Sequence, residues 1–420
     1  MSTRSPATWL RNGAALVMFL VTVLVFMFMD VGATVKPAGR LSAQDVGAAR
    51  EVWDQLKLTQ GTGASTQVQF SAETIEGLAG LLSNVTGIQR VETRLKNGVL
   101  SVSASIPLPL GLWLNSETTV AGQHAGFPAY RLKVGRISFP PTASRWIGDA
   151  VRGGFTSSGA QIPSQDELVR RVSVEDDRVI AQIALPRDVS DIDNVIMVGA
   201  DSIDTKLVSD LYCQAAADQR QDSTDLLPVL VNRLFARVPS TDAANFNRAA
   251  FVALSLLVVE EKADALVPEA AALTKDCPSP SLPVVLQGRE DLAKHWVFSA
   301  ALTSVFGAEV AANLGEWKEL GDSLPNGSGF SFVDLAANRA GMQAALLSQD
   351  PKTSALAPRA LILAREEDFL PKSLLTALEG LSEASFSDRF GNLEAKRYNQ
   401  AVARIDQVLA MKPIIGQASE

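Results

Sequence analysis

The chain contains few of the side chains that most often carry out chemistry. Its 420 residues include two cysteines, Cys213 and Cys277, and two histidines, His124 and His295. Two cysteines are too few for a disulfide framework or a zinc cage, although one disulfide could form in an oxidising compartment. Two inert buried thiols are the alternative. Motifs for a nucleophile elbow, an HExxH zinc site, a phosphate loop and a dinucleotide-binding loop are missing, so nothing favours those enzyme classes or a cofactor.

Basic and aromatic residues are scarce as well. Lysine and arginine total 38 against 46 aspartates and glutamates, which gives a formal net charge of -8. This balance argues against nucleic acid as a partner, because phosphate binding needs a cationic surface. Aromatic residues make up 6% and hydrophobic residues 47% of the chain. With abundant Ala and Leu, this globular composition favours closely packed helices, in two or three domains.

One apolar run is long enough to cross a bilayer. Gly13–Met29 contains no charged residue, and Arg4 and Arg11 precede it. A hydrocarbon core needs about 17–25 apolar residues, and basic residues favour the cytoplasmic side. We therefore predict a cytoplasmic tail over residues 1–12, a single transmembrane anchor over residues 13–30 and a periplasmic or extracytoplasmic location for the rest.

A cleaved signal peptide is the alternative to this anchor. Val31 and Ala33 are small residues that could precede a cleavage site. The run is long for a signal peptide, so the sequence favours an uncleaved anchor, with the inner membrane as a partner. No other apolar run in the chain approaches this length.

Residues 40–200 show the pattern of an α+β domain. The alternation in STQVQF predicts a strand, and SAETIEGLAGLL predicts a helix with Ser71 as a candidate N-cap. Further along, the apolar period becomes two, and Asn97-Gly98 joins two strands in the strongest short hairpin signal. A curved antiparallel sheet wrapped on helices could enclose an elongated apolar groove. His124 lies in a polar turn, where we expect a solvated loop histidine.

The segments QFSAETIEGLAGLL and VLSVSASIPLPLGLWLN form a broader pattern together with the anchor. Over residues 60–200 this pattern resembles the tubular lipid-binding (TULIP-like) proteins and the YpmS-type envelope domains. The resemblance implies that the groove holds a lipid or acyl chain. The alternative is a plain α+β domain whose apolar alternation only builds a core.

Strand patterns largely end after Val198. Successive helical patterns fill residues 201–276, and the segment CPSPSLP then interrupts them with three prolines. Helical patterns resume over residues 284–420. Short loops between such helices favour antiparallel neighbours, and no fixed repeat is present. The predicted fold class is therefore α+β followed by all-α, with a bundle-like helical domain.

Polar residues gather on three predicted helices between residues 289 and 341. Residues three or four positions apart lie on one helix face. The first helix has Asp291 and His295 at this spacing, with Ser299 one turn further along. Small residues on the neighbouring helices would let them approach closely, so a buried cluster of histidine and acids is geometrically feasible.

The second and third helices supply the acids. In the second helix Glu319 lies three residues from both Glu316 and Asp322, and Lys318 lies four residues before Asp322. In the third helix Ser331 is placed as the N-cap. The candidate catalytic residues are His295, Glu319 and Asp334, and the surrounding polar seam or ligand site consists of Asp291, Lys318, Asp322, Ser331 and Asn338.

Four functions fit this cluster. A structural seam would join the groups in ion pairs, including one between His295 and Asp291. A metal site would combine His295 with Glu319, Asp322 and Asp334, a donor set that suits several divalent ions, although no motif supports zinc. A hydrolytic site would use His295 as a base oriented by an acid. A docking surface for an envelope protein is the fourth alternative.

The segments KHWVFSAALTSVF and GEWKELGDSLPNGSGFSFVDLAANRAG carry a second resemblance. Over residues 289–341 the chain is similar to the YfiM-type envelope lipoproteins. The residues that match their pattern are Lys294, His295, Lys318, Glu319, Leu320, Asp322, Gly327, Ser328, Gly329, Ser331, Asp334, Ala340 and Gly341. Asn338 stands where the pattern has an acid, which weakens any scheme that needs a carboxylate there. The resemblance implies an envelope module without a settled activity.

Together these features predict a membrane-anchored protein of the bacterial cell envelope. We expect a non-enzymatic role in lipid handling or envelope assembly, with a lipid or acyl chain and an envelope protein as partners and no cofactor. The alternative is a hydrolase that acts on a cell-wall or envelope polymer through His295, Glu319 and Asp334.

Overall fold

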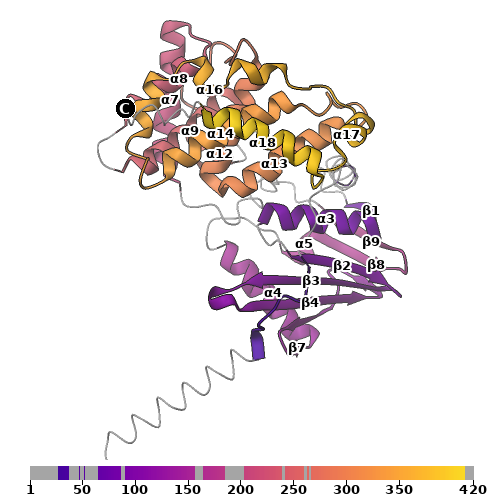
Figure 1. Ribbon diagram of the computed structural model, residues 1–420. Coiled ribbons are helices and arrows are strands. Elements are labelled where there is room, and N and C mark those ends of the chain that lie inside the picture. Colours follow the sequence, from indigo (N-terminus) through magenta and orange to yellow (C-terminus); the bar gives the residue numbers. More distant parts are fainter. Residues whose placement is uncertain are drawn as a thin grey trace, which may run out of the picture.

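The computed structural model describes most of the chain after the predicted anchor. The described residues are 27–36, 47, 52, 65–86, 90–156, 164–184, 203–238, 242–259, 263 and 266–411. The predicted tail over residues 1–12 and most of the anchor over residues 13–30 lie outside them. No helix within the described ranges has the length and apolar character needed to cross a membrane. The described chain has an α+β part with two antiparallel sheets and a helical C-terminal part (Figure 1).

Two antiparallel sheets make up the α+β unit of the described chain. The first has the order β2 (Val91–Lys96), β3 (Val99–Pro107), β4 (Trp113–Ala121), β6 (Tyr130–Val134) and β7 (Ile137–Phe139). The second has the order β1 (Ser65–Ser71), β9 (Arg178–Ala184), β8 (Val169–Val174) and β5 (Gln123–Ala125). The predicted hairpin is confirmed, since Asn97 and Gly98 join β2 to β3 with φ angles of 52° and 66°. His124 lies in β5, opposite Val172, and not in a free loop.

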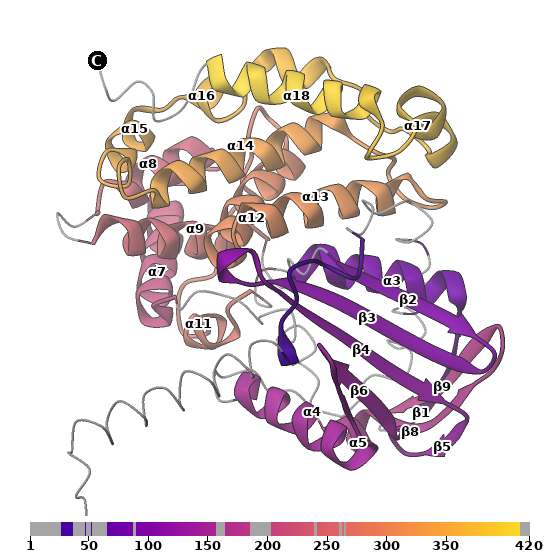
Figure 2. The same ribbon diagram turned by 60° about the horizontal axis from the view of Figure 1, so that its bottom comes forward.

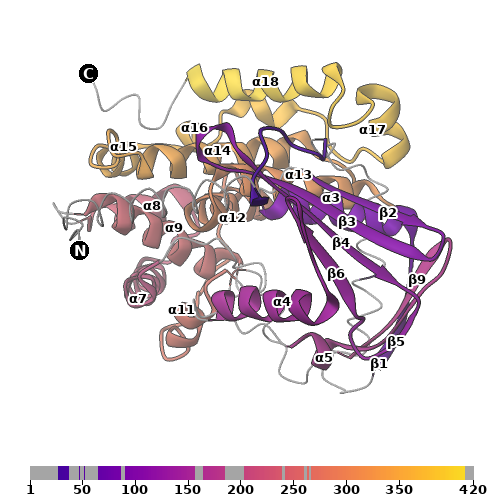
Figure 3. The same ribbon diagram turned by 90° about the horizontal axis from the view of Figure 1, so that it is seen from below.

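Helices complete the α+β unit. They are α3 (Ala72–Thr86), α4 (Pro141–Thr156), the four-residue α5 (Gln165–Leu168) and the 3-10 turn η1 (Pro109–Gly111). The Ser71 hydroxyl accepts a hydrogen bond from the Thr74 amide at 3.1 Å, as the predicted N-cap requires. Helix α4 packs along β6 (Figure 3). A small core of Val172, Val174, Val179 and Ala181 lies among half-buried side chains, and the expected lipid groove stays a prediction.

The α+β unit begins earlier than residue 40, where the sequence pattern placed its start. Asp30 pairs with Trp113 at the beginning of β4, and both backbone hydrogen bonds of this bridge are formed. Residues 27–30, the described end of the predicted anchor, are therefore part of the folded unit. The sequence pattern missed this start because the strand partner of Asp30 lies 83 positions away and leaves no local pattern.

The helical part follows residue 203 (Figure 2). Its elements are α7 (Thr205–Asp222), α8 (Leu227–Phe235), α9 (Ala243–Val259), α11 (Pro268–Leu273), α12 (Glu290–Phe306), α13 (Ala308–Ser323), α14 (Phe332–Gln349), α15 (Ala357–Leu363), α16 (Glu366–Phe369), η2 (Lys372–Thr376), α17 (Glu383–Phe390) and α18 (Lys396–Met411). One hydrophobic core extends from Val208 to Leu409. The proline-containing segment over residues 277–283 contains no buried residue and joins helices that share this one core.

Helices α12 and α14 cross in close contact at the centre of this core. A side chain at Gly341 would overlap the backbone of Trp296, so this position requires glycine. Trp296 is fully buried and packs its ring against Phe251 and Phe369. A disulfide joins Cys213 of α7 to Cys277 beyond α11, with their Cα atoms 5.1 Å apart. Of the two alternatives that the sequence left open, a disulfide or two free thiols, the structure has the disulfide.

Candidate functional site

Three helices bring the predicted polar residues together. His295 comes from α12, Lys318 and Glu319 from α13, and Asp334 and Asn338 from α14. The close crossing of α12 and α14, which depends on Gly341, brings the imidazole within reach of the acids. The cluster lies inside the helical part, because Glu319 is 0% and Asp334 only 8% exposed. The buried cluster of histidine and acids that the spacing made feasible is therefore formed.

The Lys318 ammonium lies at the centre of the cluster. Its Nζ atom is 2.9 Å from Glu319 Oε1, 2.8 Å from Asp322 Oδ2 and 3.1 Å from His295 Nε2. Asp334 Oδ2 lies 3.5 Å away. Burial lowers the pKa of Lys318, but the neighbouring carboxylates of Glu319 and Asp322 outweigh it and raise that pKa above its ordinary value. The lysine therefore stays charged and neutralises part of the buried negative charge.

Both ring nitrogens of His295 have partners within the protein. Asn338 Oδ1 accepts a hydrogen bond from the Ser299 hydroxyl at 2.9 Å, and it lies 2.9 Å from His295 Nδ1. Because an amide oxygen only accepts, Nδ1 must carry the hydrogen. In the neutral ring Nε2 then accepts from Lys318, and in the protonated ring it donates to Asp334 Oδ2, 3.3 Å away.

The two buried acids have opposite pKa shifts. Burial raises the pKa of Glu319, and the charge and hydrogen bond of Lys318 only partly offset this effect. Its Oε2 also accepts a hydrogen bond from the Ser331 amide at 3.0 Å. Burial raises the pKa of Asp334 too. The hydrogen bond from His295 and the charges of His295 and Lys318 together lower this pKa by more than burial raises it, so the net shift is downward. Of the two acids, Asp334 thus gives up its proton more readily.

Asp291 does not pair with His295, contrary to the structural-seam expectation. Its carboxylate oxygens accept hydrogen bonds from Arg289 Nε at 3.1 Å and Nη2 at 2.5 Å. Side chains on a helix lean towards its N-terminus, so Asp291 points to the start of α12 while His295 reaches across to α14. Arg289 also bonds to Glu379 at 2.6 Å and lies 3.5 Å from Asp334 Oδ1. It therefore caps the outer side of the cluster.

Two other parts of the expected pattern are confirmed, and a third is not. Lys318 pairs with Asp322, and the Ser331 hydroxyl accepts from the Asp334 amide at 3.0 Å, as a helix cap does. Glu316, by contrast, turns away from the cluster and accepts a hydrogen bond from the Tyr398 hydroxyl at 3.0 Å. The acids of α13 therefore do not form one continuous stripe.

The cluster has the ligands of a metal site but already contains a cation. Donor atoms of His295, Glu319 and Asp334 all lie within 4.8 Å of one another. The Lys318 ammonium contacts these same three side chains, so a metal ion would have to displace it. A fixed ammonium among carboxylates is the arrangement of a buried ion-pair network.

The cluster also lacks the geometry of a nucleophile with its base. Within the described ranges, no hydroxyl or thiol group forms a hydrogen bond with His295. The nearby Ser299 hydroxyl is buried and donates to Asn338, and the Ser331 hydroxyl caps α14. An activated nucleophile needs a hydrogen bond to the base, so covalent hydrolysis is not supported here.

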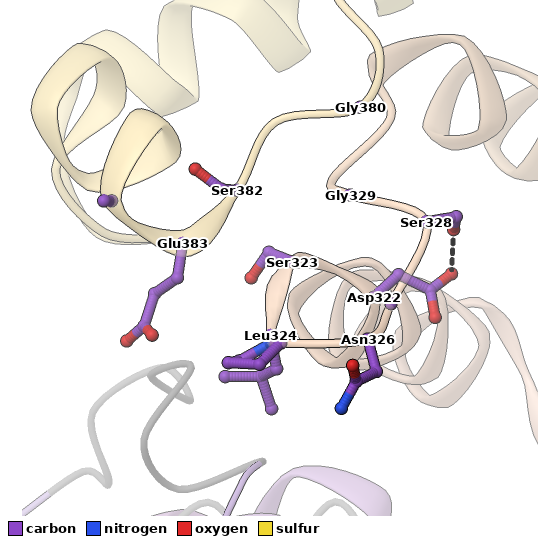
Figure 4. A pocket seen from close by; sticks show the side chains of 12 residues that line it. Asp322, Ser323, Leu324, Asn326, Ser328, Gly329, Gly380, Ser382 and Glu383 are labelled. Carbon is purple, nitrogen blue, oxygen red and sulfur yellow. Dashed lines mark hydrogen bonds between the residues drawn. The ribbon is translucent and has the colours of Figure 1, made fainter.

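A pocket opens beside Asp322, on the outer side of the cluster (Figure 4). Its volume is about 430 Å³, and it lies between the turn after α13 and the segment that leads into α17. Its lining residues are Asp322, Ser323, Leu324, Pro325, Asn326, Gly327, Ser328, Gly329, Gly380, Ser382, Glu383 and Ala384. Figure 4 shows the carboxylates of Asp322 and Glu383 on either side of Leu324.

The pocket is built on close backbone contact between its two walls. A side chain at Gly329, whose φ is 92°, would overlap the backbone of Gly380. Phe330 and Leu381 exchange backbone hydrogen bonds of 2.8 and 3.1 Å. The Ser328 hydroxyl donates to Asp322 Oδ2, which also binds Lys318. The ion-pair network therefore holds one wall of the pocket in place.

Sequence reasoning missed the second wall of the pocket. Gly380, Ser382 and Glu383 belong to no pattern that points to a site, and they lie 50 or more positions from the turn they face. Backbone hydrogen bonds of Phe330 with Leu381 and of Phe332 with Leu378 bring them there. Ser382, the N-cap of α17, was the one local signal, and a cap marks a helix start without implying a binding site.

Comparison with known proteins returned no match, whether with protein families, with curated proteins or with solved structures.

Proposed function

We propose that the protein is a membrane-anchored, extracytoplasmic protein of the cell envelope that acts by binding and not by catalysis, in envelope assembly or lipid handling. The uncharged run Gly13–Met29 supports the anchor. The disulfide between Cys213 and Cys277 supports an oxidising compartment, because disulfides persist in secreted and periplasmic proteins and are rare in the cytosol.

The observation that carries a binding function is the filled ion-pair network next to an open pocket. The side chains of His295, Glu319, Asp322 and Asp334 all contact the Lys318 ammonium. The network ties α12, α13 and α14 together and, through Asp322 and Ser328, positions the wall of the pocket. A preorganised wall lowers the entropic cost of binding a partner.

The pocket lining favours a polar group of a partner molecule. Carboxylates, hydroxyls and the Asn326 amide line it, with Leu324, Pro325 and Ala384 as its apolar part. Carboxylates on both sides of the cavity suit hydroxyl or ammonium donors. In this part of the protein the chemistry therefore favours assembly with an envelope component over the binding of an acyl chain. The resemblances to the YfiM-type and TULIP-like proteins agree with an envelope location and stay predictions.

The test compares pocket and network variants in cells of the source organism. Glu383→Gln with Asn326→Gly alters the pocket without touching the network, and glycine tolerates the φ of 70° that Asn326 adopts. If the protein acts by binding, this double variant loses the function of the wild type while keeping its melting temperature. His295→Asn should lose cellular function only in proportion to the fraction of the protein that it unfolds. Release of fragments from purified cell wall by the wild-type protein, abolished by His295→Asn, would instead establish the hydrolase alternative.

A further inference from the structure

The chain is fixed to the α+β unit directly after the apolar run. Asp30 and Trp113 exchange backbone hydrogen bonds of 2.8 and 2.7 Å, and the Arg136 amide donates to the Met27 carbonyl at 2.9 Å. A side chain at Gly135 would overlap the backbone of Met27. Met27 is part of the predicted anchor, so no flexible linker separates the anchor from the sheet.

Buried polar side chains reinforce this attachment. The Asn115 amide donates to Asp30 Oδ2 and to the Gly32 carbonyl, both at 3.0 Å. The Ser105 hydroxyl, which is 0% exposed, accepts from the Val35 amide at 3.1 Å. Buried groups hold their partners tightly because an unpaired polar atom costs free energy. The end of the sheet around Trp113 therefore has a set position relative to the anchor.

An apolar turn lies at this same end of the sheet. Ile106–Leu114, with the sequence IPLPLGLWL, contains nine consecutive residues without a polar side chain. It includes the connection between β3 and β4. Leu110 at its tip is 97% exposed, and Val31, which follows the bridge to Trp113, is 91% exposed. Within the described ranges these are the two most exposed large hydrophobic side chains.

The backbone at the tip is strained as well. Leu110 has a φ of 66°, in the left-handed region that side chains other than those of Gly, Asn and Asp seldom adopt. A glycine at this position would avoid both the strain and the exposed apolar surface. Strained residues with exposed side chains mark places where function outweighs stability. The turn therefore has the features of a contact surface.

The side chains around the turn suit a lipid surface. Trp113 lies at its base, and tryptophan is enriched at the membrane interface. Arg90 stacks over the Trp113 ring at 4.6 Å and donates to the Val35 carbonyl at 3.1 Å, and Arg136 pairs with Asp30 at 3.3 Å. No acidic residue interrupts the apolar turn.

We propose that the Ile106–Leu114 turn and Val31 insert into the outer face of the bilayer that holds the predicted anchor. This inference rests on the proposed anchor. The bilayer is the one occupant that the attachment places beside the turn, because Met27 and Asp30 are bonded to the same sheet end. The α+β unit then lies on the membrane. Figure 1 shows the helical part at the opposite end of the molecule from the segment that starts at Met27, so it faces away from the lipid.

The experiment uses the full chain in nanodiscs of phosphatidylethanolamine and phosphatidylglycerol. An environment-sensitive fluorophore is attached to Leu110→Cys, to Val17→Cys in the anchor or to Lys96→Cys. Lys96 is an exposed residue of β2 at the other end of β3, beside the turn that joins β2 to β3, and serves as the matched control. The native cysteines are bonded to each other, so only the added thiol reacts. Lipids that carry a quencher in the acyl chain report contact with the bilayer.

Quenching at positions 110 and 17, at least threefold greater than at position 96, supports the inference. Quenching at position 17 alone overturns it and leaves the anchor intact. Absence of quenching at all three positions overturns both proposals.

A second variant guards against a label that perturbs the turn. Leu110→Asp with the fluorophore at Val31→Cys should lose more than half of the quenching, at an unchanged melting temperature. Unchanged quenching in this variant would also overturn the insertion.

Discussion

The two parts of the molecule are stabilised in different ways. The helical part has one large core with fully buried aromatic side chains such as Phe251, Trp296 and Tyr398. The α+β part has a small core around Val172 and depends on polar bonds to residues 27–36. Apolar burial contributes about 25 cal/mol per Å², so the helical part can tolerate a buried charge network. The sheet, in contrast, is held in place by its bonds to residues 27–36.

A large effect is expected at the helix crossing. Gly341→Ala places a methyl group into the Trp296 backbone and forces α12 and α14 apart. We expect a loss of at least about 3 kcal/mol of stability, because overpacking of a tight core costs 1–3 kcal/mol and the contact here is with rigid backbone. Gly153→Ala, at an exposed and open position of α4, is the matched control and should stabilise slightly. Equal melting temperatures of the two variants would contradict the role of the crossing.

Removal of the disulfide should destabilise the helical part alone. Cys213 and Cys277 are 64 positions apart, and closing a loop of this size restricts the unfolded chain by about 4 kcal/mol. Cys213→Ser with Cys277→Ser should lower the denaturant midpoint of the helical part. Fluorescence from a probe at Lys96→Cys, in the sheet, should keep its own transition. A single shared shift of both transitions would show that the two parts unfold as one unit.

Loss of the central ammonium should weaken the helical part by a smaller amount. Lys318→Met leaves Glu319 buried without its partner, which we expect to cost about 2–3 kcal/mol. The value is below that for a fully buried pair because the Lys318 side chain is 40% exposed. Adding Glu319→Gln should recover most of the loss, since a neutral amide needs no counter-charge. If the double variant is no more stable than Lys318→Met, the pair does not interact as described.

The pH dependence of stability should distinguish the two buried acids. Because the pKa of Glu319 is raised in the folded protein, its contribution falls as pH rises above about 4 towards that raised value. Because the pKa of Asp334 is lowered, its contribution is complete above about pH 4 and is lost below it. Each acid changes the slope by at most about 1.4 kcal/mol per pH unit.

Unfolding curves from pH 3 to 7 test this division. Glu319→Gln should remove the decline above pH 4, and Asp334→Asn should remove the decline below it. Identical slopes in wild type and both variants would rule out the assignment.

Local patterns in the sequence predicted local structure well. Asn97-Gly98 predicted its hairpin, Ser71 and Ser331 their helix caps, and the four-residue spacing the ion pair of Lys318 with Asp322. These contacts join residues at most four positions apart, and backbone geometry alone brings such residues together. The predicted pairing of Asp291 with His295 was wrong, and Asp291 binds Arg289 instead. Helix spacing predicts which residues share a face but not the direction in which each side chain leans.

The sequence by itself determined the order of an α+β part and a helical part, the apolar run before them and the candidate residues of the polar cluster. The tertiary structure decided how those residues interact. It placed Lys318 among the acids, paired Phe330 with Leu381 to form the pocket, and bonded Asp30 to Trp113 at the apolar turn. The physical reason is that distant segments meet only where buried faces pack together. A local sequence pattern does not specify how whole helices and sheets pack against each other.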